Sequence, residues 1–469
     1  MKKIDAFLTE IARVLEPHQV TRAPEDLAYY AQDWSRTLSV NASAALFPKN
    51  TDEVASILKS AHEHEIPVVP SGGRTGLSGG AVATKGEVVL SLSKLDFMGE
   101  VHTGALSLRV GAGAITEAVH RYCAPYGLTW PVDFASKGSS TIGGNIATNA
   151  GGVRVIRYGN TRNWVLGLTV VTMQGEVLQL NHELEKNNTG YDFRQLLLGS
   201  EGTLGVITEA TLKLCTLPSS TLVALFSLAD FSRLLELFSF SRKSFPSLSA
   251  FECLDSACME SVIGHFGFAR PVGSGDKAGS PAAVYALLEL ENVSFSEVET
   301  EMTAILESGM VLDGVIAQNE RESKALWAYR EGVAESILHD SEVHQEDVSV
   351  PIAALGEFYS TITERYAKAL PGWKTFFFGH IGDGNLHIFI QKPEDLETAE
   401  FNKRAKETDL ELFRILSGLQ GSVSAEHGIG LLKKHAIHFS RSVRELELMR
   451  QVKRSFDPKG LLNPGKIID

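Results

Sequence analysis

The sequence contains little cysteine. Its 469 residues include four cysteines, Cys123, Cys215, Cys253 and Cys258. Cys253 and Cys258 stand five positions apart, a spacing that fits neither a zinc site nor a redox pair. We therefore expect buried free thiols in a reducing compartment rather than a disulfide framework.

Positive charge and long apolar runs are also scarce. The chain has 44 Lys and Arg against 57 Asp and Glu, a formal net charge of −13. A nucleic-acid-binding surface needs basic patches, so we expect no nucleic-acid partner. Residues 1–17 resemble neither a signal nor a transit peptide, and no run approaches the roughly 18 apolar residues that span a bilayer. We expect a cytoplasmic protein without an integral membrane segment, with peripheral membrane association left open.

Glycine, in contrast, is abundant: 42 residues, about 9% of the chain against a norm of roughly 7%. The excess gathers in Pro131–Gly152 (PVDFASKGSSTIGGNIATNAGG) and Pro70–Val82 (PSGGRTGLSGGAV). Glycine lets the main chain approach a bound group closely, and successive N–H groups form concave anion sites. The two stretches predict a phosphorylated cofactor whose diphosphate is reached from two sides. The alternative is a pair of ordinary glycine-rich loops.

Neither stretch matches the common nucleotide-binding motifs. No Gly-Lys-Ser/Thr follows Pro70–Val82, which excludes a Walker loop, and no GxGxxG opens a helix as in the Rossmann fingerprint. Apolar patterns predict a hairpin over 164–171 and 176–180 and a strand over 206–214. After Pro218 the pattern changes, and we expect a second, α+β domain over 219–415. Its largest predicted helix is 320–338, and 270–282 is predicted to be a loop.

The sharpest local pattern is FFFGHIGDGNLHIFI, Phe376–Ile390. Two apolar runs flank Asp383-Gly384, a dipeptide typical of a two-residue hairpin turn. Counting outward from that turn places His380 opposite His387 on one face of the hairpin. Two such imidazoles suit a divalent metal, although two strand histidines can also be ordinary polar residues.

A third metal ligand is available in SAEHGIG, Ser424–Gly430. If Glu426 joined the two histidines, the site would be a His₂Glu set with an open position, the catalytic kind. His427 would then be free to act as a base near neutral pH. The alternative is that Glu426 and His427 form an exposed turn.

Six motifs in this order resemble one family. They are PSGGRTGLSGG, KGSSTIGGNIATNAGG, GSEGTLGVITEATLKL, GHIGDGNLH, SAEHGIG and FDPKGLLNPGK. From about residue 40 to the C-terminus the chain is similar to the FAD-linked oxidases of the vanillyl-alcohol oxidase type. Within them it resembles the D-2-hydroxy-acid dehydrogenase branch, which includes D-lactate dehydrogenase, D-2-hydroxyglutarate dehydrogenase and the glycolate oxidase D subunit.

The resemblance implies an α+β fold with three parts. Residues 1–218 would form a two-subdomain FAD-binding domain of the p-cresol methylhydroxylase (PCMH) type. Residues 219–415 would form an α+β cap domain with an antiparallel sheet, carrying the substrate and metal site. Residues 416–469 would return to the FAD domain. The loop SGGRTGLSGG contains no histidine, so FAD is expected to be bound non-covalently.

The resemblance also assigns residues to roles. His380, His387 and Glu426 would bind Zn²⁺ or another divalent metal, His427 would take the hydroxyl proton, and Arg330 would grip the substrate carboxylate. Asn385 would belong to the residues that contact the substrate. The alternative interpretation of Arg330 is a charge on the surface of a helix. The residues expected to hold FAD are Pro70, Ser71, Gly72, Gly73, Arg74, Thr75, Gly76, Leu77, Ser78, Gly79, Pro131, Gly138, Ser139, Thr141, Gly143, Gly144, Asn145, Ala147, Thr148, Asn149, Gly151, Glu201, Gly202, Gly205, Val206, Ile207 and Asn463.

The implied activity is FAD-dependent oxidation of a small D-2-hydroxy acid, assisted by the metal. The 2-hydroxyglutarate-type members carry a lysine shortly before the motif DVSVP, where this chain has His344-Gln345-Glu346-Asp347. Losing that cation favours a smaller or less charged acid. Two other functions remain open: a flavoprotein subunit of a multi-protein oxidase, and a non-redox FAD enzyme such as an alkyl-transferring ether-lipid synthase. The electron acceptor could be a quinone, a cytochrome or an electron-transferring flavoprotein, and a homodimer is possible.

Overall fold

The structure is a computed structural model that describes residues 2–273, 282–339 and 341–469. The chain divides into two units. Met1–Gly152, Gly159–Leu217 and Glu426–Asp469 form the first unit, and Val153–Tyr158 and Pro218–Ala425 form the second.

The first unit contains two main sheets. Its strands are β1 (Val20–Thr21), β2 (Ala42–Leu46), β3 (Val68–Ser71), β4 (Glu87–Ser91), β5 (Met98–His102), β6 (Ser107–Gly111), β7 (Leu128–Thr129), β8 (Val165–Val171), β9 (Val177–Leu180), β10 (Val206–Lys213) and β11 (Cys215–Thr216). The first sheet has the order β1-β2-β4-β3, with β2, β4 and β3 parallel. The second is antiparallel with the order β5-β6-β10-β8-β9, and β7 pairs separately with β11.

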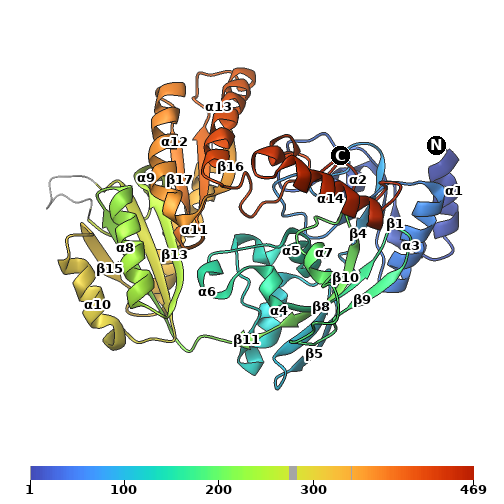
Figure 1. Ribbon diagram of the computed structural model, residues 1–469, viewed down its shortest axis with the longest axis horizontal. Coiled ribbons are helices and arrows are strands. Elements are labelled where there is room, and N and C mark those ends of the chain that lie inside the picture. Colours follow the sequence, from blue (N-terminus) through green and yellow to red (C-terminus); the bar gives the residue numbers. More distant parts are fainter. Residues whose placement is uncertain (1, 274–281, 340) are drawn as a thin grey trace. The chain divides into compact units, whose positions relative to one another are not determined.

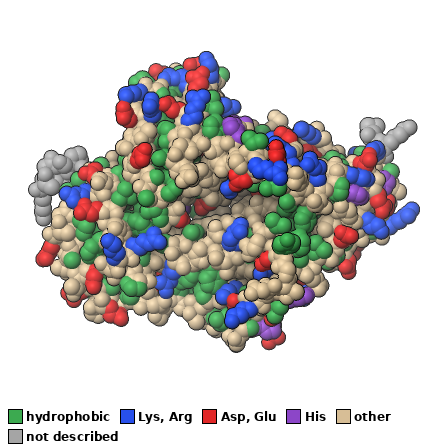
Figure 2. All heavy atoms as spheres, viewed as in Figure 1, with side chains coloured by type: hydrophobic (Ala, Val, Ile, Leu, Met, Phe, Trp, Pro, Cys, Tyr) green, Lys and Arg blue, Asp and Glu red, His purple; other side chains and the backbone are tan. Residues whose placement is uncertain are grey.

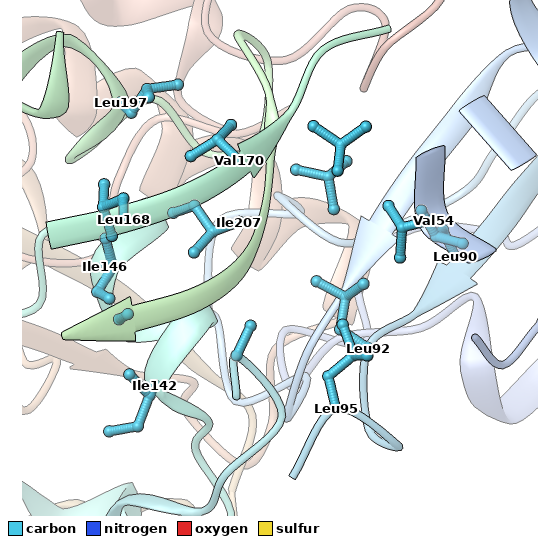
Figure 3. Close-up of a cluster of buried hydrophobic side chains, with 14 of the residues drawn as sticks. Val54, Leu90, Leu92, Leu95, Ile142, Ile146, Leu168, Val170, Leu197 and Ile207 are labelled. Atoms are coloured by element: carbon cyan, nitrogen blue, oxygen red, sulfur yellow. The ribbon is translucent and has the colours of Figure 1, made fainter. Parts of the chain in front are cut away.

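One hydrophobic core joins these two sheets (Figure 3). The helices of this unit are α1 (Lys2–Ile11), α2 (Pro24–Tyr30), α3 (Thr51–His64), α4 (Thr116–Cys123), α5 (Ile142–Thr148), α7 (Arg194–Leu197) and α14 (Val443–Phe456). Val54 of α3 and Leu90 of β4 belong to the same buried cluster as Ile207 of β10 and Ile142 and Ile146 of α5. Full burial of an isoleucine contributes roughly 1.5–3 kcal/mol, so the core fixes α5, the helix within Pro131–Gly152. Pro70–Val82 is called the first glycine-rich stretch below, and Pro131–Gly152 the second.

The second unit is built on a seven-stranded antiparallel sheet (Figure 1). Its strands are β12 (Thr221–Leu228), β13 (Leu248–Asp255), β14 (Val284–Glu291), β15 (Asp313–Ile316), β16 (Val343–Ser349), β17 (Thr375–His380) and β18 (Asn385–Gln391). They stand in the order β15-β12-β14-β13-β17-β18-β16. The helices of this unit are α6 (Val155–Tyr158), α8 (Phe231–Ser244), α9 (Ser256–Phe266), α10 (Phe295–Glu307), α11 (Glu320–Leu338), α12 (Leu355–Ala369) and α13 (Thr398–Gly418).

Helices cover both faces of this sheet. Phe377 and Phe378 are neighbours on β17 and therefore point to opposite faces. Phe378 lies in a buried cluster with Met259 of α9 and Val333 of α11. Phe377 contacts Tyr359 of α12, with ring centroids 5.3 Å apart. The face that carries Phe378, covered by α9 and α11, is called the α11 face below.

Several expectations about local structure can be compared with the fold. The predicted helix 320–338 is confirmed as α11, and the predicted hairpin over 164–171 and 176–180 is confirmed as β8–β9. The predicted loop over 270–282 lies partly outside the described residues. Cys123, Cys253 and Cys258 are buried free thiols. Burial raises the pKa of Cys123 to about 11.

Two surface properties bear on the expected partners. Lys and Arg side chains are interspersed with Asp and Glu over the face shown in Figure 2. Within the described part of the chain, none of the helices has the length and apolar character needed to cross a membrane.

Candidate functional site

The first glycine-rich stretch leaves β3 and is held by side chains from distant parts of the first unit. Asp33 Oδ2 accepts the N–H of Gly79 at 2.8 Å. Asn463 Nδ2 donates to the carbonyl of Gly80 at 3.0 Å and to that of Glu201 at 2.7 Å. Asn463 therefore ties the C-terminal segment to both the glycine-rich stretch and the loop before β10.

A buried lysine supports the same stretch. Lys466 is 1% exposed, and its Nζ donates to the carbonyl of Val82 at 2.8 Å. Burial lowers the pKa of Lys466 to about 8, although the nearby Glu87 favours its charge. The lowered pKa means that desolvation of the ammonium group outweighs its favourable contacts, so the charged form of Lys466 costs stability in the folded chain.

The two glycine-rich stretches are in contact, and glycine is required where they meet. A Cβ on Gly72 would lie 2.5 Å from Thr141 Oγ1, and a Cβ on Gly73 would overlap the carbonyl oxygen of Ser139. Any larger residue at these positions would push the stretches apart. The prediction that the two stretches act on one group is consistent with this packing.

Three buried oxygens in this region have no hydrogen-bond partner. They are Ser71 Oγ, Thr141 Oγ1 and Asn463 Oδ1. Buried polar atoms are normally paired, so three such atoms beside glycine backbone point to a bound polar group. Two hydroxyls suit phosphate or ribityl oxygens and one amide oxygen suits an N–H or O–H donor, so the residues fit a flavin dinucleotide.

The other residues expected to hold the cofactor lie around these stretches. Asn145 Nδ2 donates to Thr116 Oγ1 at 2.7 Å, and Asn149 Oδ1 accepts the N–H of Arg162 at 3.0 Å. Both amides therefore support the chain itself. Pro131 follows β7, Gly138 ends a short 3₁₀ helix, Gly143, Gly144, Ala147 and Thr148 lie in α5, Gly151 follows it, and Arg74, Thr75, Gly76 and Leu77 lie in the loop after β3.

Glu201 has a structural role that sequence reasoning missed. Its carboxylate accepts the N–H groups of Ile429 and Gly430 at 2.7 and 2.8 Å. Burial raises the pKa of Glu201, while these two hydrogen bonds lower it. The carboxylate thus anchors the segment that follows His427. Gly202, Gly205, Val206 and Ile207 continue from it into β10.

His427 is held from the first glycine-rich stretch. Ser78 Oγ lies 2.8 Å from the carbonyl oxygen of His427 and 2.9 Å from that of Gly428. The imidazole Nε2 stands 4.0 Å from Glu426 Oε1, and both side chains are partly exposed. The predicted base is therefore fixed through its backbone by the same stretch that is predicted to hold the cofactor.

The predicted pairing of the two histidines in the second unit is wrong. His380 pairs with Asn385 and Phe378 pairs with His387, because four residues, Ile381–Gly384, connect β17 and β18 instead of two. This register differs from the predicted one by two positions, which preserves the face of each side chain. His380 and His387 are therefore diagonal neighbours on the α11 face, with ring centroids 5.4 Å apart.

Each histidine has a buried carboxylate at Nδ1. Glu252 Oε1 lies 2.7 Å from Nδ1 of His380, and Asp347 Oδ1 lies 3.6 Å from Nδ1 of His387. Metal-binding histidines commonly direct their second nitrogen to a carboxylate, which orients the ring and leaves the other nitrogen for the metal. The chemistry of this pair fits a divalent ion bound through Nε2.

Arg330 is buried on the same face. It is 8% exposed, its Nε lies 2.9 Å from Glu252 Oε2, and its Cζ lies 5.0 Å from the ring centroid of Phe378. The alternative of a surface charge is thereby excluded. Asn385 Nδ2 donates to Asp347 Oδ1 at 2.8 Å, so this amide positions the carboxylate beside His387.

Glu426 and His427 belong to the first unit and directly follow the last residue of the second. That residue, Ala425, donates its N–H to Asp347 Oδ2 at 3.1 Å. Asp347 is the cross-strand partner of His387. Glu426 is the next residue after Ala425, and consecutive Cα atoms are about 3.8 Å apart. Glu426 therefore follows this contact by one residue.

Sequence reasoning missed Glu252 and Asp347. Glu252 lies in the fully buried strand β13, where an acidic residue within an apolar run is the available signal. Asp347 lies in β16, VHQEDVS, whose polar sequence gives no such signal. Sequence reasoning also missed a cluster on the face of the sheet opposite to the α11 face. There Nε2 of His344 stands 2.7 Å from Oδ1 of Asp409 and 3.9 Å from Oε1 of Glu346.

Comparison with known proteins identifies the family of the chain. The family described as "FAD binding domain" matches residues 42–181, and the family described as "FAD linked oxidases, C-terminal domain" matches residues 217–467. The first unit thus carries an FAD-binding domain. The chain belongs to the FAD-linked oxidases, which confirms the predicted family.

Two similar relatives are both named D-2-hydroxyglutarate dehydrogenase. The one from Xanthomonas citri pv. viticola is 44% identical and covers 99% of this chain and 97% of the relative. The one from Stutzerimonas stutzeri is 39% identical and covers 98% of each.

Solved structures share the fold at low identity. p-Cresol methylhydroxylase has a TM-score of 0.77 at 16% identity, covering 100% of this chain and 98% of its own. Alkyldihydroxyacetonephosphate synthase has a TM-score of 0.74 at 18% identity, covering 98% and 85%. These likenesses confirm the predicted α+β, PCMH-type fold.

Proposed function

We propose that the protein is an FAD-dependent dehydrogenase that oxidises a D-2-hydroxy acid to the 2-oxo acid. One observation carries the proposal: Arg330, His380 and His387 are buried together on the α11 face, each at most 8% exposed. A guanidinium binds a carboxylate through two parallel hydrogen bonds, and imidazoles bind a divalent metal. A 2-hydroxy acid offers a carboxylate and a hydroxyl on adjacent carbons, which are the two groups that such a face would bind.

The residues of the chain divide the work of the reaction. Arg330 binds the substrate carboxylate, and His380, His387 and Glu426 would hold Zn²⁺ or another divalent ion, which would lower the pKa of the substrate hydroxyl. His427 takes the hydroxyl proton, and its backbone is fixed by Ser78. FAD supplies the acceptor for the hydride that leaves Cα, so one proton and one hydride together account for the two-electron oxidation.

The names of the relatives favour D-2-hydroxyglutarate as the substrate. The second carboxylate of that acid needs a hydrogen-bond donor, and on the α11 face β16 offers the amide of Gln345, whereas the neighbouring Asp347 can only accept. His344 points to the other face, where it pairs with Asp409. D-Lactate and D-malate therefore belong in the same substrate panel as D-2-hydroxyglutarate.

The test is an anaerobic titration of the purified flavoprotein with the D and L forms of these acids. Loss of the flavin absorbance with a D acid, and none with its L form, supports the proposal. A flavin adduct without net reduction would instead support the alkyl-transferring alternative. Reduction that needs an added protein fraction would support a subunit of a larger oxidase. The physiological acceptor is proposed to be a quinone, a cytochrome or an electron-transferring flavoprotein.

A further inference from the structure

Glu252 is a charged residue at the centre of a buried strand. It is the fifth residue of β13, LSAFECLD, all of which is buried, and Glu252 itself is 0% exposed. A carboxylate in such a place is costly unless it is paired and hydrogen-bonded. Its two oxygens are therefore expected to have specific partners.

The two oxygens of Glu252 contact two different groups of the proposed site. Oε1 lies 2.7 Å from Nδ1 of His380, which is the cross-strand partner of Glu252 on β17. Oε2 lies 2.9 Å from Nε of Arg330 on α11. This second contact is an ion pair without hydrogen-bond geometry. Neither Oε2 of Glu252 nor Nε of Arg330 makes a hydrogen bond.

The contact with Oε1 determines which nitrogen of His380 can bind a metal. A carboxylate only accepts hydrogen bonds, so the imidazole must carry its hydrogen on Nδ1 to make this bond. The lone pair is then on Nε2. Carboxylate partners of this kind orient the ring, and their loss typically lowers metal affinity about 10–100-fold.

The contact with Oε2 determines which part of Arg330 can bind a substrate. With Nε facing Glu252, the two terminal nitrogens remain as the pair that can grip a carboxylate. Phe378 lies beneath the guanidinium, with 5.0 Å between Cζ and the ring centroid. The guanidinium is thus held from one edge and one face.

We propose that Glu252 is a positioning residue that couples the substrate arginine to the metal-binding histidine. The buried carboxylate of Glu252 fixes the separation between Arg330, which would bind the substrate carboxylate, and His380, which would hold the metal at the substrate hydroxyl. This inference rests on the proposed function. It predicts that removing the charge at position 252 weakens metal binding and substrate binding together.

Glu289 provides a matched control. It lies on the adjacent strand β14, 2% exposed, and it also binds one side chain of α11: Trp327 Nε1 donates to its Oε2 at 2.9 Å. Its other oxygen lies 2.7 Å from Nε of Arg154. Glu289→Gln therefore perturbs an equally buried carboxylate without touching His380 or Arg330.

The experiment compares Glu252→Gln, Glu289→Gln and the wild type as FAD-loaded full chains. Zn²⁺ retention is measured against increasing chelator by elemental analysis, and KM and kcat are measured separately. We expect Glu252→Gln to retain Zn²⁺ about 10–100-fold less tightly and to raise KM about tenfold or more. We expect Glu289→Gln to match the wild type in both, with FAD content and thermal midpoint reporting folding.

A double-mutant cycle tests the coupling itself. If Glu252 acts on the substrate through Arg330, adding Glu252→Gln to Arg330→Gln raises KM little further. If the two residues act independently, the fold-increases in KM of the two single variants multiply in the double variant. Equal Zn²⁺ retention and KM in Glu252→Gln and Glu289→Gln would overturn the inference, as would a wild type that binds no divalent ion. A wild type that binds Zn²⁺ but is reduced by no 2-hydroxy acid would overturn the proposed function alone, because Zn²⁺ retention is measured without turnover.

Discussion

The hydroxyl of Ser78 donates to the backbone carbonyl of His427, although the two residues are 349 positions apart. Ser78 belongs to the first glycine-rich stretch, and His427 is the proposed base. The carbonyl of Ser78 also accepts the N–H groups of Leu431 and Leu432. The first glycine-rich stretch and the proposed base are therefore parts of one hydrogen-bonded assembly within the first unit.

The Ser78 hydroxyl is expected to matter for turnover more than for cofactor binding. In Ser78→Ala the carbonyls of His427 and Gly428 lose their donor, at roughly 1 kcal/mol for such a hydrogen bond. We expect kcat per bound FAD to fall about tenfold. Ser43→Ala is the control, since Ser43 Oγ makes a similar bond to the carbonyl of Gly86. Equal kcat in the two variants would contradict the role assigned to Ser78.

The contact between the glycine-rich stretches can be tested with one added methyl group. Gly73→Ala places a Cβ against the carbonyl of Ser139, so the stretches must separate. We expect less bound FAD per chain, measured by absorbance after gel filtration. Gly104→Ala adds the same methyl group where no atom lies within 4 Å. Full FAD content in Gly73→Ala would show that the contact does not shape the site.

The metal proposal predicts different behaviour for two histidines on opposite faces of one sheet. His380→Ala is expected to keep its yellow FAD and to lose both the bound metal and turnover. His344→Ala removes a histidine that pairs with Asp409 on the other face, and it should keep both. Elemental analysis and steady-state assays on the same samples decide the matter. Full activity of His380→Ala without metal would contradict the metal-assisted mechanism.

The buried Lys466 predicts a pH dependence of stability. Its pKa is lowered to about 8, so between pH 8 and about 10.5 the unfolded chain binds a proton that the folded chain does not. Stability contributed by this group therefore rises with pH over that window, by on the order of 3 kcal/mol. Lys466→Met should remove the rise.

The measurement is the urea midpoint of wild type and Lys466→Met at pH 7 and pH 10. We expect the urea midpoint of Lys466→Met, relative to that of the wild type, to be higher at pH 7 than at pH 10. Lys3→Met, at an exposed position, should show no such change. A constant difference between wild type and Lys466→Met across this range would show that the lysine is not perturbed.

Local patterns predicted those parts of the fold that depend on local physics. α11 follows from helical spacing, and the β8–β9 hairpin from alternation around a Gln-Gly turn. The register of β17 and β18 was not predictable from Asp383-Gly384, because the connection includes a short 3₁₀ turn and spans four residues. The face of the two histidines survived this error because side chains alternate with a period of two.

The positioning groups of the site could not be found from spacing. Glu252 meets His380 and Arg330 only after three segments, 78 and 50 residues apart along the chain, assemble into the sheet and its covering helix. Glu201 was expected among the cofactor residues, and the contact of its carboxylate with the backbone after His427 was likewise not foreseen. Such roles depend on tertiary contacts, which carry no short-range signature in the sequence.

The most direct measurement is anaerobic reduction of the bound flavin by D-2-hydroxyglutarate, D-lactate and D-malate, before and after metal removal. Loss of the oxidised-flavin absorbance reports hydride transfer to the bound flavin without any external acceptor. The account predicts rapid bleaching with at least one D acid, none with the L forms, loss after chelation, and recovery when Zn²⁺ or another divalent ion is restored. Bleaching that is unaffected by metal removal, or absent with every 2-hydroxy acid, would contradict it.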